Sequence, residues 1–283
     1  MWCSRTWPFS SAPVMVTRTP PHPIRSGTAP RDPVPDRTDV APVRRVMPSP
    51  SPSPSSPSSP SSPSSSTSAA DLTFVVRSIA RTAVDNERAF GDLDAVAGDG
   101  DFGYSLARGF EIVLSDWDAL ASDSPAEFLK KVALVISKRV GGTSGPLWGT
   151  AFLRAAGAVK DRQELNAADA VAMLRAAAEG IKARGKSDLG DKTLLDALIP
   201  MTDALEQRLD QRSAAGEPAA GGAELAALAA TTARAAADAT APMRARRGRQ
   251  SYTGERSIGS PDPGAVAIAV MAERVAAEWD VRE

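Results

Sequence analysis

The chain has 283 residues, with 33 basic and 34 acidic side chains and a formal net charge of −1. A charge this close to zero argues against a nucleic-acid binder, whose surface is strongly basic. The only cysteine is Cys3, and the longest apolar run, 265–272, is too short to cross a bilayer, which excludes a disulfide framework, a cysteine metal site and a membrane-spanning helix. We therefore expect a cytoplasmic protein without nucleic-acid or membrane partners.

Residues 1–69 differ in composition from the rest of the chain. From residue 17 onward they are mostly Pro, Ser, Arg and Thr, ending in a nearly pure Ser-Pro run at 48–66. Such a segment cannot bury enough apolar surface to offset the entropy lost on ordering, so the sequence predicts a disordered tail. Its arginines and serines are also compatible with an organelle transit peptide. A start site placed too far upstream is equally compatible, with Met15 or Met47 as later starts.

Residues 70–283 are rich in Ala, Leu and Val and poor in aromatic residues, a composition that favours helices. Apolar side chains recur at helical spacing, with breaks at Gly, Pro and Asp clusters. The pattern predicts one all-α domain whose eight helices span 71–91, 104–121, 125–139, 147–160, 167–184, 191–211, 223–241 and 264–280. Glycine-rich breaks follow the first, third, fifth and seventh helices. In an up-and-down antiparallel arrangement these four breaks meet at one end, where we expect the functional site.

The first break places three carboxylates, Asp94, Asp99 and Asp101, within eight residues. The last two alternate with glycines, which let a charged ligand approach the main chain closely. Mg²⁺ prefers oxygen ligands and usually shares them with substrate phosphates, so the cluster favours a metal–nucleotide site. A solvated acidic turn is the alternative, because Gly and Asp are common in turns. An EF-hand is excluded, because counting from Asp99 puts Tyr104 at the position that needs glycine.

The second break, 141–146, reads Gly-Gly-Thr-Ser-Gly-Pro and leads into a helix. Backbone N–H groups freed by glycines at a helix N-terminus, together with two hydroxyls, suit a phosphate. A tight turn between helices is the alternative interpretation.

The third break, 185–193, overlaps the pattern of a P-loop, because 180–187 reads Gly-x-x-x-x-Gly-Lys-Ser. That motif requires a preceding β-strand, whereas here it follows a helical pattern, so a P-loop is disfavoured. Beyond it, Asp191 could cap the next helix and Lys192 could neutralise a phosphate. A solvated helix cap is the alternative.

The fourth break, 246–265, carries several arginines, whose planar guanidinium groups suit phosphate oxygens. Long loops in compact domains are usually functional. Taken alone, the loop is equally compatible with a nucleic-acid or partner surface. The acidic first break would repel a polyanion unless metal were bound, which favours a nucleotide.

Together the four breaks resemble the nucleotide-binding L subunit of dihydroxyacetone kinases, also found as the C-terminal domain of single-chain ATP-dependent kinases. The resemblance covers essentially all of 70–283 and follows the family order: Asp94-x4-Asp99-x-Asp101-x-Gly103, then 141–146, then Gly190-Asp191-Lys192-Thr193, then 248–265. It implies a barrel of eight antiparallel helices with ADP or ATP at one end. One departure is Phe102, where the bacterial subunits often have His, so no polar role is expected of that side chain.

The resemblance also implies roles for individual residues. Asp94, Asp99 and Asp101 would bind two Mg²⁺ ions that bridge the phosphates, and with Arg249 they would form the catalytic set. The nucleotide would contact residues of all four breaks, namely Phe102, Gly103, Tyr104, Ser105, Thr143, Ser144, Gly185, Leu194, Arg249, Asp262, Pro263 and Gly264.

In that family a histidine on a separate K subunit or domain holds the keto-sugar covalently. The only histidine here, His22, lies in the predicted tail, so the resemblance implies the phosphoryl-transfer half of a glycerone kinase that needs a K subunit. Two sources of phosphate stay open: exchanging ATP, or a retained ADP that a phosphohistidine phosphotransferase protein rephosphorylates. The acceptor could also be another short ketose or a tetrose. A non-catalytic regulatory nucleotide-binding subunit is the alternative class, and we expect a homodimer or hetero-oligomer.

Overall fold

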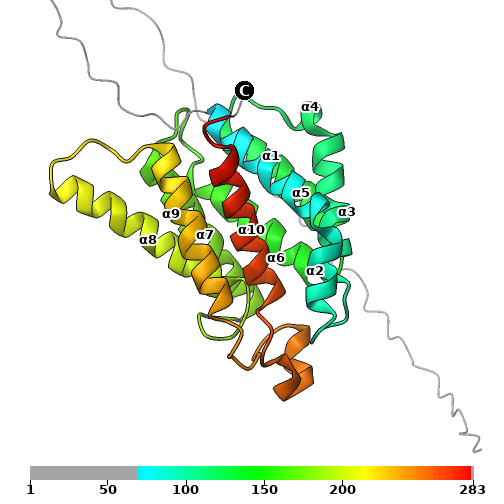
Figure 1. Cartoon of the computed structure of the whole chain (residues 1–283). Coiled ribbons are helices and arrows are strands. Elements are labelled where there is room, and N and C mark those ends of the chain that lie inside the picture. The colour runs from blue at the N-terminus through cyan, green and yellow to red at the C-terminus, as the bar shows by residue number, and fades with distance from the viewer. Residues whose placement is uncertain (1–68, 282–283) are drawn as a thin grey trace, which may run out of the picture. The chain divides into compact units, whose positions relative to one another are not determined.

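The computed structural model of the chain describes residues 69–281, and within that range all regular structure is helical, without a β-strand. This confirms the predicted all-α class; the predicted tail lies outside the described residues except for Ala69. The elements are α1 (Ala69–Asp85), α2 (Glu87–Asp94), α3 (Phe102–Ser115), α4 (Trp117–Leu120), α5 (Pro125–Arg139), α6 (Ser144–Ala158), α7 (Ala167–Gly185), α8 (Leu195–Ala214), α9 (Gly222–Asp238), the 3-10 helix η1 (Arg249–Ser257) and α10 (Pro263–Glu278), as Figure 1 shows.

Two of the predicted helices are divided in the structure. The predicted helix at 71–91 is interrupted at Asn86, whose side-chain amide donates a 2.9 Å hydrogen bond to the carbonyl oxygen of Thr82. Such a bond offers the backbone an alternative to regular helix pairing. The predicted helix at 104–121 is interrupted at Asp116, which separates α3 from the single turn of α4.

The predicted helix at 191–211 begins later than expected, at Leu195. Gly190 and Lys192 have φ angles of 90° and 61°, which are outside the right-handed helical region. Asp191 therefore precedes the helix and does not cap it. The prediction of a cap at this residue was wrong.

Two other helices begin with a side-chain cap followed by a proline, a pattern that is typical of helix starts. The Ser124 hydroxyl accepts a 3.4 Å hydrogen bond from the Glu127 N–H at the start of α5. The Asp262 carboxylate accepts a 2.8 Å hydrogen bond from the Ala265 N–H at the start of α10. Each satisfies a backbone donor that the helix leaves unpaired. The 3-10 helix η1, inside the fourth break, was not predicted.

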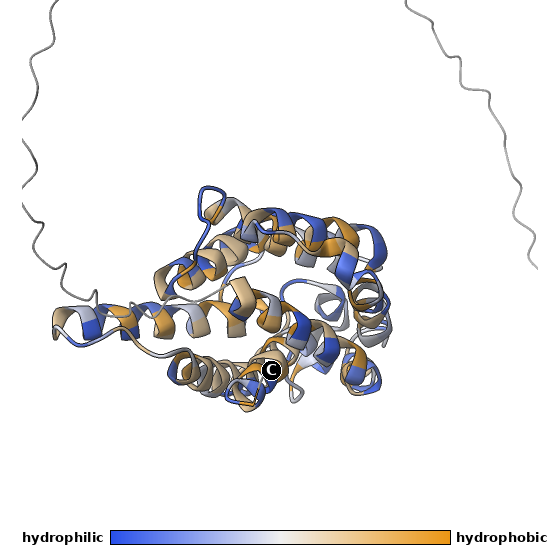
Figure 2. Ribbon diagram, turned by 90° about the horizontal axis from the view of Figure 1, so that it is seen from above, coloured by the Kyte–Doolittle hydropathy of each residue, from blue (hydrophilic) through white to orange (hydrophobic). Residues whose placement is uncertain are grey.

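The long helices contact one another in a closed cycle. In chain order α1 packs on α3, α3 on α5, and each later helix on the next as far as α10, which packs back on α1. The short α2 lies against α3, and α4 contacts both α3 and α5. Viewed from above, the helices form a ring (Figure 2). The helix ends next to the four glycine-rich breaks can therefore lie beside one another.

The buried core has two parts with different compositions. One part joins the first half of the domain through large side chains such as Phe110 and Phe128. The other is rich in alanine and includes Ala233 and Ala237 of α9 and Ala265 of α10, all fully buried. Small side chains let neighbouring helices pack closely, so α9 holds α10, and with it the residues just before α10, in a fixed position.

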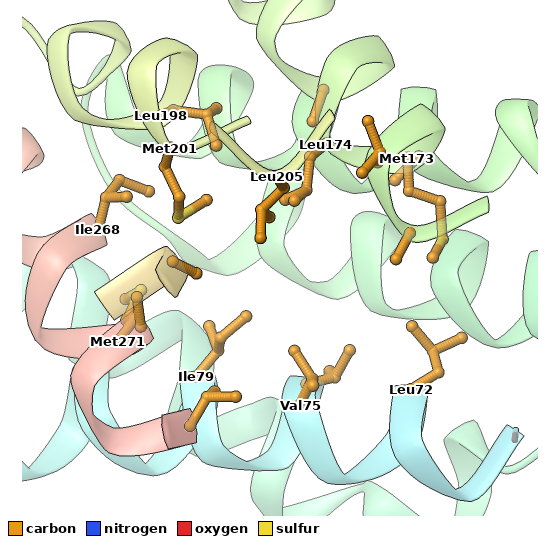
Figure 3. A pocket seen from close by; sticks show the side chains of 18 of the residues that line it. Leu72, Val75, Ile79, Met173, Leu174, Leu198, Met201, Leu205, Ile268 and Met271 are labelled. Carbon is orange, nitrogen blue, oxygen red and sulfur yellow. The ribbon is translucent and has the colours of Figure 1, made fainter. Parts of the chain in front are cut away.

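An apolar cavity of about 300 Å³ lies inside the ring of helices. Figure 3 shows aliphatic side chains of α1 across the cavity from those of α7 and α8, with two from α10 at one side. The labelled residues are Leu72, Val75, Ile79, Met173, Leu174, Leu198, Met201, Leu205, Ile268 and Met271. Its lining is apolar almost throughout, so this cavity supplies few groups for acid–base or metal chemistry.

Within residues 69–281, no helix combines the length and apolar character that crossing a bilayer requires.

We predict that Ala233→Leu lowers the free energy of unfolding by about 1–3 kcal/mol, because the added carbons have no room between α9 and its neighbours. Urea unfolding followed by circular dichroism measures the change. Ala235→Leu is the matched control, because Ala235 is exposed on the same helix; it should alter stability by less than about 0.5 kcal/mol. Equal effects of the two substitutions would contradict the packing assigned to α9.

Candidate functional site

Residues from all four glycine-rich breaks line one pocket of about 150 Å³ at the end of the ring that carries η1. Twelve of the expected site residues are part of its lining: Asp94, Asp99, Asp101, Phe102, Thr143, Ser144, Gly185, Leu194, Arg249, Asp262, Pro263 and Gly264. These residues are spread over most of the folded chain. The ring of helices is what brings them together.

Three expected site residues do not line this pocket. Gly103 packs α3 against α2, since a side chain there would place its Cβ 1.9 Å from the carbonyl oxygen of Glu87. Tyr104 is 59 % exposed, and its ring stacks on the guanidinium of Arg108. Ser105 lies beside the second break, with its hydroxyl near Gly141.

Ten further residues line the pocket; among them the sequence suggested a phosphate contact for Lys192 and for the glycines of the second break, and it assigned no individual role to the others. Most of them lie within the glycine-rich breaks, where the motifs predict a site. Leu147 and Ile181 instead have the sequence pattern of ordinary buried positions in helices. The added residues are Gly141, Gly142, Leu147, Ile181, Ser187, Lys192, Thr193, Arg247, Gly248 and Gln250.

The acidic cluster is compact. Asp94, Asp99 and Asp101 each offer one carboxylate oxygen, and these oxygens all lie within 4.8 Å of one another. Asp94 is buried at the end of α2, while Asp99 and Asp101 are partly exposed. The cluster is open to solvent on the side of Asp99 and Asp101. Three carboxylate oxygens at this spacing fit a hard divalent cation whose remaining coordination positions are filled by a bound molecule.

The loop that follows α2 is folded around the carboxylate of Asp94. One oxygen of Asp94 accepts hydrogen bonds from the backbone N–H groups of Gly100, at 2.9 Å, and Phe102, at 3.4 Å. Gly98 has no side chain to obstruct this fold, whereas a Cβ there would come within 2.2 Å of the other oxygen of Asp94. Gly100 has a φ of 77°, which favours glycine. The sequence of this loop thus fixes the orientation of Asp94.

The charges of the cluster repel one another. Burial raises the pKa of Asp94, against the hydrogen bonds from Phe102 and Gly100, and the charges of Asp99 and Asp101 raise it further. Burial and the charge of Asp99 likewise raise the pKa of Asp101, while Arg249 lowers it. Raised carboxylate pKa values mean that the cluster favours a nearby positive charge, whether from arginine or from a metal ion.

Arg249, at the start of η1, supplies one such charge. Its guanidinium pairs with the carboxylate of Asp99 and lies 3.4 Å from that of Asp101. It also lies beside Gly142 of the second break. These side chains are partly exposed, so the ion pairs contribute about 1 kcal/mol or less to stability. Their importance is that they bring a positively charged hydrogen-bond donor to the acidic cluster.

Asp262 lines the pocket at the start of α10. Its backbone N–H donates a 2.8 Å hydrogen bond to the hydroxyl of Thr240, and its carboxylate caps α10. Burial raises the pKa of Asp262 to about 7, and the charge of Asp196 adds to the increase, while Lys192 opposes it. The buried carboxyl group is therefore poised between its neutral and charged forms near neutral pH.

The third break does not form a P-loop. Gly180 lies inside α7, and residues 69–281 contain no strand to precede it. A side chain at Gly180 would place its Cβ 2.5 Å from Arg154, so this glycine serves the packing of α7.

The fold and site describe an all-helical domain with an acidic loop, a glycine-rich turn and an arginine at one end. The pattern of the DAK2 domain matches residues 96–277 of the chain. The chain therefore belongs to the DAK2-domain family, which confirms the resemblance drawn from the motifs.

Curated relatives include both a separate subunit and a longer enzyme. The chain is 40 % identical over 184 residues to the Escherichia coli protein named PEP-dependent dihydroxyacetone kinase, ADP-binding subunit DhaL, covering 65 % of this chain and 84 % of that protein. It is 36 % identical to the L-erythrulose 1-kinase of Mycolicibacterium smegmatis, covering 72 % of this chain but 34 % of that enzyme.

A solved structure shares the fold. The crystal structure of the dihydroxyacetone kinase of C. freundii in its native form matches with a TM-score of 0.57 and 23 % identity, covering 81 % of this chain and 39 % of that chain. A second structure of that kinase, in complex with AMP-PNP and Mg²⁺, matches with a TM-score of 0.56 and 22 % identity. At this identity the similarity concerns the fold.

We predict that Asp262→Asn removes a pH-dependent loss of stability. Because the folded-state pKa of Asp262 is about 7, above the ordinary value of 3.8, the folded chain binds a proton that the unfolded chain releases. The stabilising effect of that proton is present at low pH and is lost as pH rises to about 7. Between pH 5 and pH 8 the wild-type chain should lose about 2 kcal/mol more unfolding free energy than the Asn variant.

Urea unfolding of both chains at the two pH values measures this difference. Asn keeps a side-chain oxygen that can accept the capping hydrogen bond, so the helix start is retained in the variant. Parallel pH profiles for the two chains would show that Asp262 is ionised throughout.

Proposed function

We propose that this chain is the nucleotide- and magnesium-binding phosphoryl-transfer subunit of a dihydroxyacetone (glycerone) kinase. The supporting observation is the convergence of three carboxylates, a glycine-rich turn and Arg249 on one pocket. Phosphoryl transfer requires mainly positioning and charge neutralisation from a protein, and this set of groups suits both tasks. The E. coli relative, an ADP-binding subunit by name, supports the same assignment.

Asp94, Asp99 and Asp101 would hold the metal, and we propose two Mg²⁺ ions. Bound there, Mg²⁺ would neutralise charge on the phosphate oxygens. Asp94 is held by the N–H groups of Gly100 and Phe102, so its ligand oxygens are oriented before any ion binds. Asp99 and Asp101 are partly exposed and can adjust to it.

The nucleotide would lie between the second break and η1. Thr143 begins α6 without using its side chain as a cap, so its hydroxyl remains available to a phosphate, beside that of Ser144. Leu147, Ile181 and Leu194 provide an apolar wall suited to a nucleoside. We assign the remaining contacts to the residues named from the resemblance, with Phe102, Gly185, Asp262, Pro263 and Gly264 lining the pocket and Gly103, Tyr104 and Ser105 supporting it from α3.

Arg249 would act in catalysis by stabilising charge on the transferred phosphoryl group. It contacts the acidic cluster from η1, and its guanidinium stays charged at all physiological pH values. Once cations neutralise the carboxylates, the same side chain can turn toward the phosphate without a change in the helices.

The keto-sugar would be held by a separate K subunit, because residues 69–281 contain no histidine that could bind a ketone covalently. Dihydroxyacetone is the first candidate acceptor. A tetrose is the second, supported by the relative named L-erythrulose 1-kinase. The phosphate donor would be ATP, or a phosphohistidine phosphotransferase protein that recharges a retained ADP, and we place the reaction in the cytoplasm. A homodimer, or a hetero-oligomer with the K subunit, would carry it out.

We also propose that the closed cycle of contacts from α1 to α10 is a barrel of eight antiparallel helices. The eight long helices that contact in sequence order support it. In such a barrel alternate junctions share one end, which accounts for the common pocket of the four breaks.

We predict that Asp99→Asn weakens Mg–ADP binding more than about tenfold while leaving the helical circular dichroism signal unchanged, because it removes a metal ligand from an exposed loop. Isothermal titration calorimetry with and without Mg²⁺ measures the affinity. Asp92→Asn is the matched control: Asp92 is a nearby exposed carboxylate of α2, outside the cluster. Equal affinities in the wild-type and Asp99→Asn chains would contradict the metal assignment.

We predict that the wild-type chain, mixed with the K subunit of a dihydroxyacetone kinase, Mg²⁺ and dihydroxyacetone, forms dihydroxyacetone phosphate, and that neither subunit does so alone. Supplying ATP, or ADP with a phosphohistidine donor, in separate reactions identifies the phosphate source. Tight Mg–ADP binding without transfer from either source would favour the regulatory alternative.

A further inference from the structure

Lys192 is a buried charge that the proposed site does not use. It is 1 % exposed and lies in the third break, where the sequence suggested a role in neutralising phosphate. Its ammonium group donates hydrogen bonds to the carbonyl oxygens of Met243, at 3.0 Å, of Ser260, at 2.7 Å, and of Ser257. An ammonium has three donors, and here all three are used by the backbone. None remains for a phosphate.

The three acceptors lie at the two ends of one loop. Met243 directly precedes residues 244–260, the arginine loop, while Ser257 and Ser260 are near its end. One side chain therefore ties both ends of the arginine loop together. Arg249 lies between them, at the start of η1.

Neighbouring contacts strengthen this attachment. The carbonyl oxygen of Asp191 accepts a 3.0 Å hydrogen bond from the N–H of Arg246, inside the arginine loop. The carboxylate of Asp196 accepts hydrogen bonds from the N–H groups of Gly190, at 2.6 Å, and Thr193, at 2.7 Å. The third break is thus held to α8 on one side and to the arginine loop on the other.

The backbone of Lys192 is in an unfavourable conformation. Its φ of 61° is uncommon for a residue with a side chain, and such a conformation persists only where the surroundings impose it. Burial also lowers the pKa of Lys192, opposed by the charge of Asp262. Both features cost stability, so they are better explained by a task at the site than by folding alone.

We propose that Lys192 is a positioning residue for phosphoryl transfer: its ammonium joins the two ends of the arginine loop and so holds Arg249 against the acidic cluster. The inference rests on the proposed function. Much of the arginine loop is exposed, with Tyr252 at 91 % exposure near its tip. Without the ammonium, Arg249 would sample positions away from the pocket, and a displacement of about 1 Å can reduce a rate about 100-fold.

The first test uses Lys192→Met, which keeps much of the side-chain length and removes the charge. Hydrogen exchange of the ligand-free chain should accelerate about tenfold or more in peptides covering 244–260 and stay unchanged in peptides of α5 and α6. Lys186→Met is the matched control, because Lys186 is exposed and also has a positive φ, of 50°. Unchanged exchange in the arginine loop would overturn the inference.

The second test asks whether Lys192 acts through Arg249. In the transfer assay with a K subunit, Lys192→Met should lower kcat about 10-fold to 100-fold with less than about a threefold change in the KM for nucleotide. In an Arg249→Ala background the same substitution should have less than about a twofold further effect, since two residues acting through one group are not additive. If Lys192→Met lowered kcat by the same factor in the wild-type and Arg249→Ala backgrounds, the inference would be overturned.

Two further results keep the tests decisive. If Lys192→Met does not fold, Lys192→Gly replaces it in both tests, because glycine adopts a positive φ without strain. If the wild-type chain binds no Mg–ADP and transfers no phosphate, the proposed function fails, and Lys192 cannot position groups for transfer. Hydrogen exchange then decides by itself whether Lys192 joins the ends of the arginine loop.

Discussion

Three negative charges in a small volume are the constraint around which this domain is arranged. The carboxylates of Asp94, Asp99 and Asp101 come within 4.8 Å of one another, and their mutual repulsion makes positive partners favourable. The structure meets this need in two ways. The Gly98–Gly103 loop holds Asp94 by backbone hydrogen bonds, and Arg249 reaches the cluster from a loop 150 residues away in sequence.

The ring of helices makes such a distant partnership possible. Each long helix packs on the next, and the last packs on the first, so loops from four parts of the sequence border one pocket. Close packing of α9 on α10 through alanines fixes the start of α10, where Asp262 lines the pocket. The rigid part of the molecule thus positions residues that are themselves on loops.

Two cavities within residues 69–281 differ in the chemistry that they allow. The larger cavity, about 300 Å³ inside the ring, is lined by aliphatic and aromatic side chains. The smaller pocket, about 150 Å³, contains the carboxylates, hydroxyls and arginines. We propose the smaller pocket as the place of phosphoryl transfer although the other cavity is larger, since that reaction depends on charge and on hydrogen-bond donors. The family relationship and the distribution of charge both favour the smaller pocket.

The sequence by itself determined the all-α class, most helix boundaries and the four glycine-rich breaks, because helical periodicity and turn residues are local signals. It also identified the acidic cluster and Arg249 as candidate site residues.

Tertiary structure decided the rest. Leu147 and Ile181 line the pocket although they have the pattern of core residues, and Gly103 turned out to pack two helices together. Lys192 shows the limit most clearly: a lysine in the run Gly-Asp-Lys-Thr suggests a phosphate ligand, but its ammonium donates to three carbonyl groups. Those carbonyls come from residues more than 50 positions away, and no local pattern encodes such a contact.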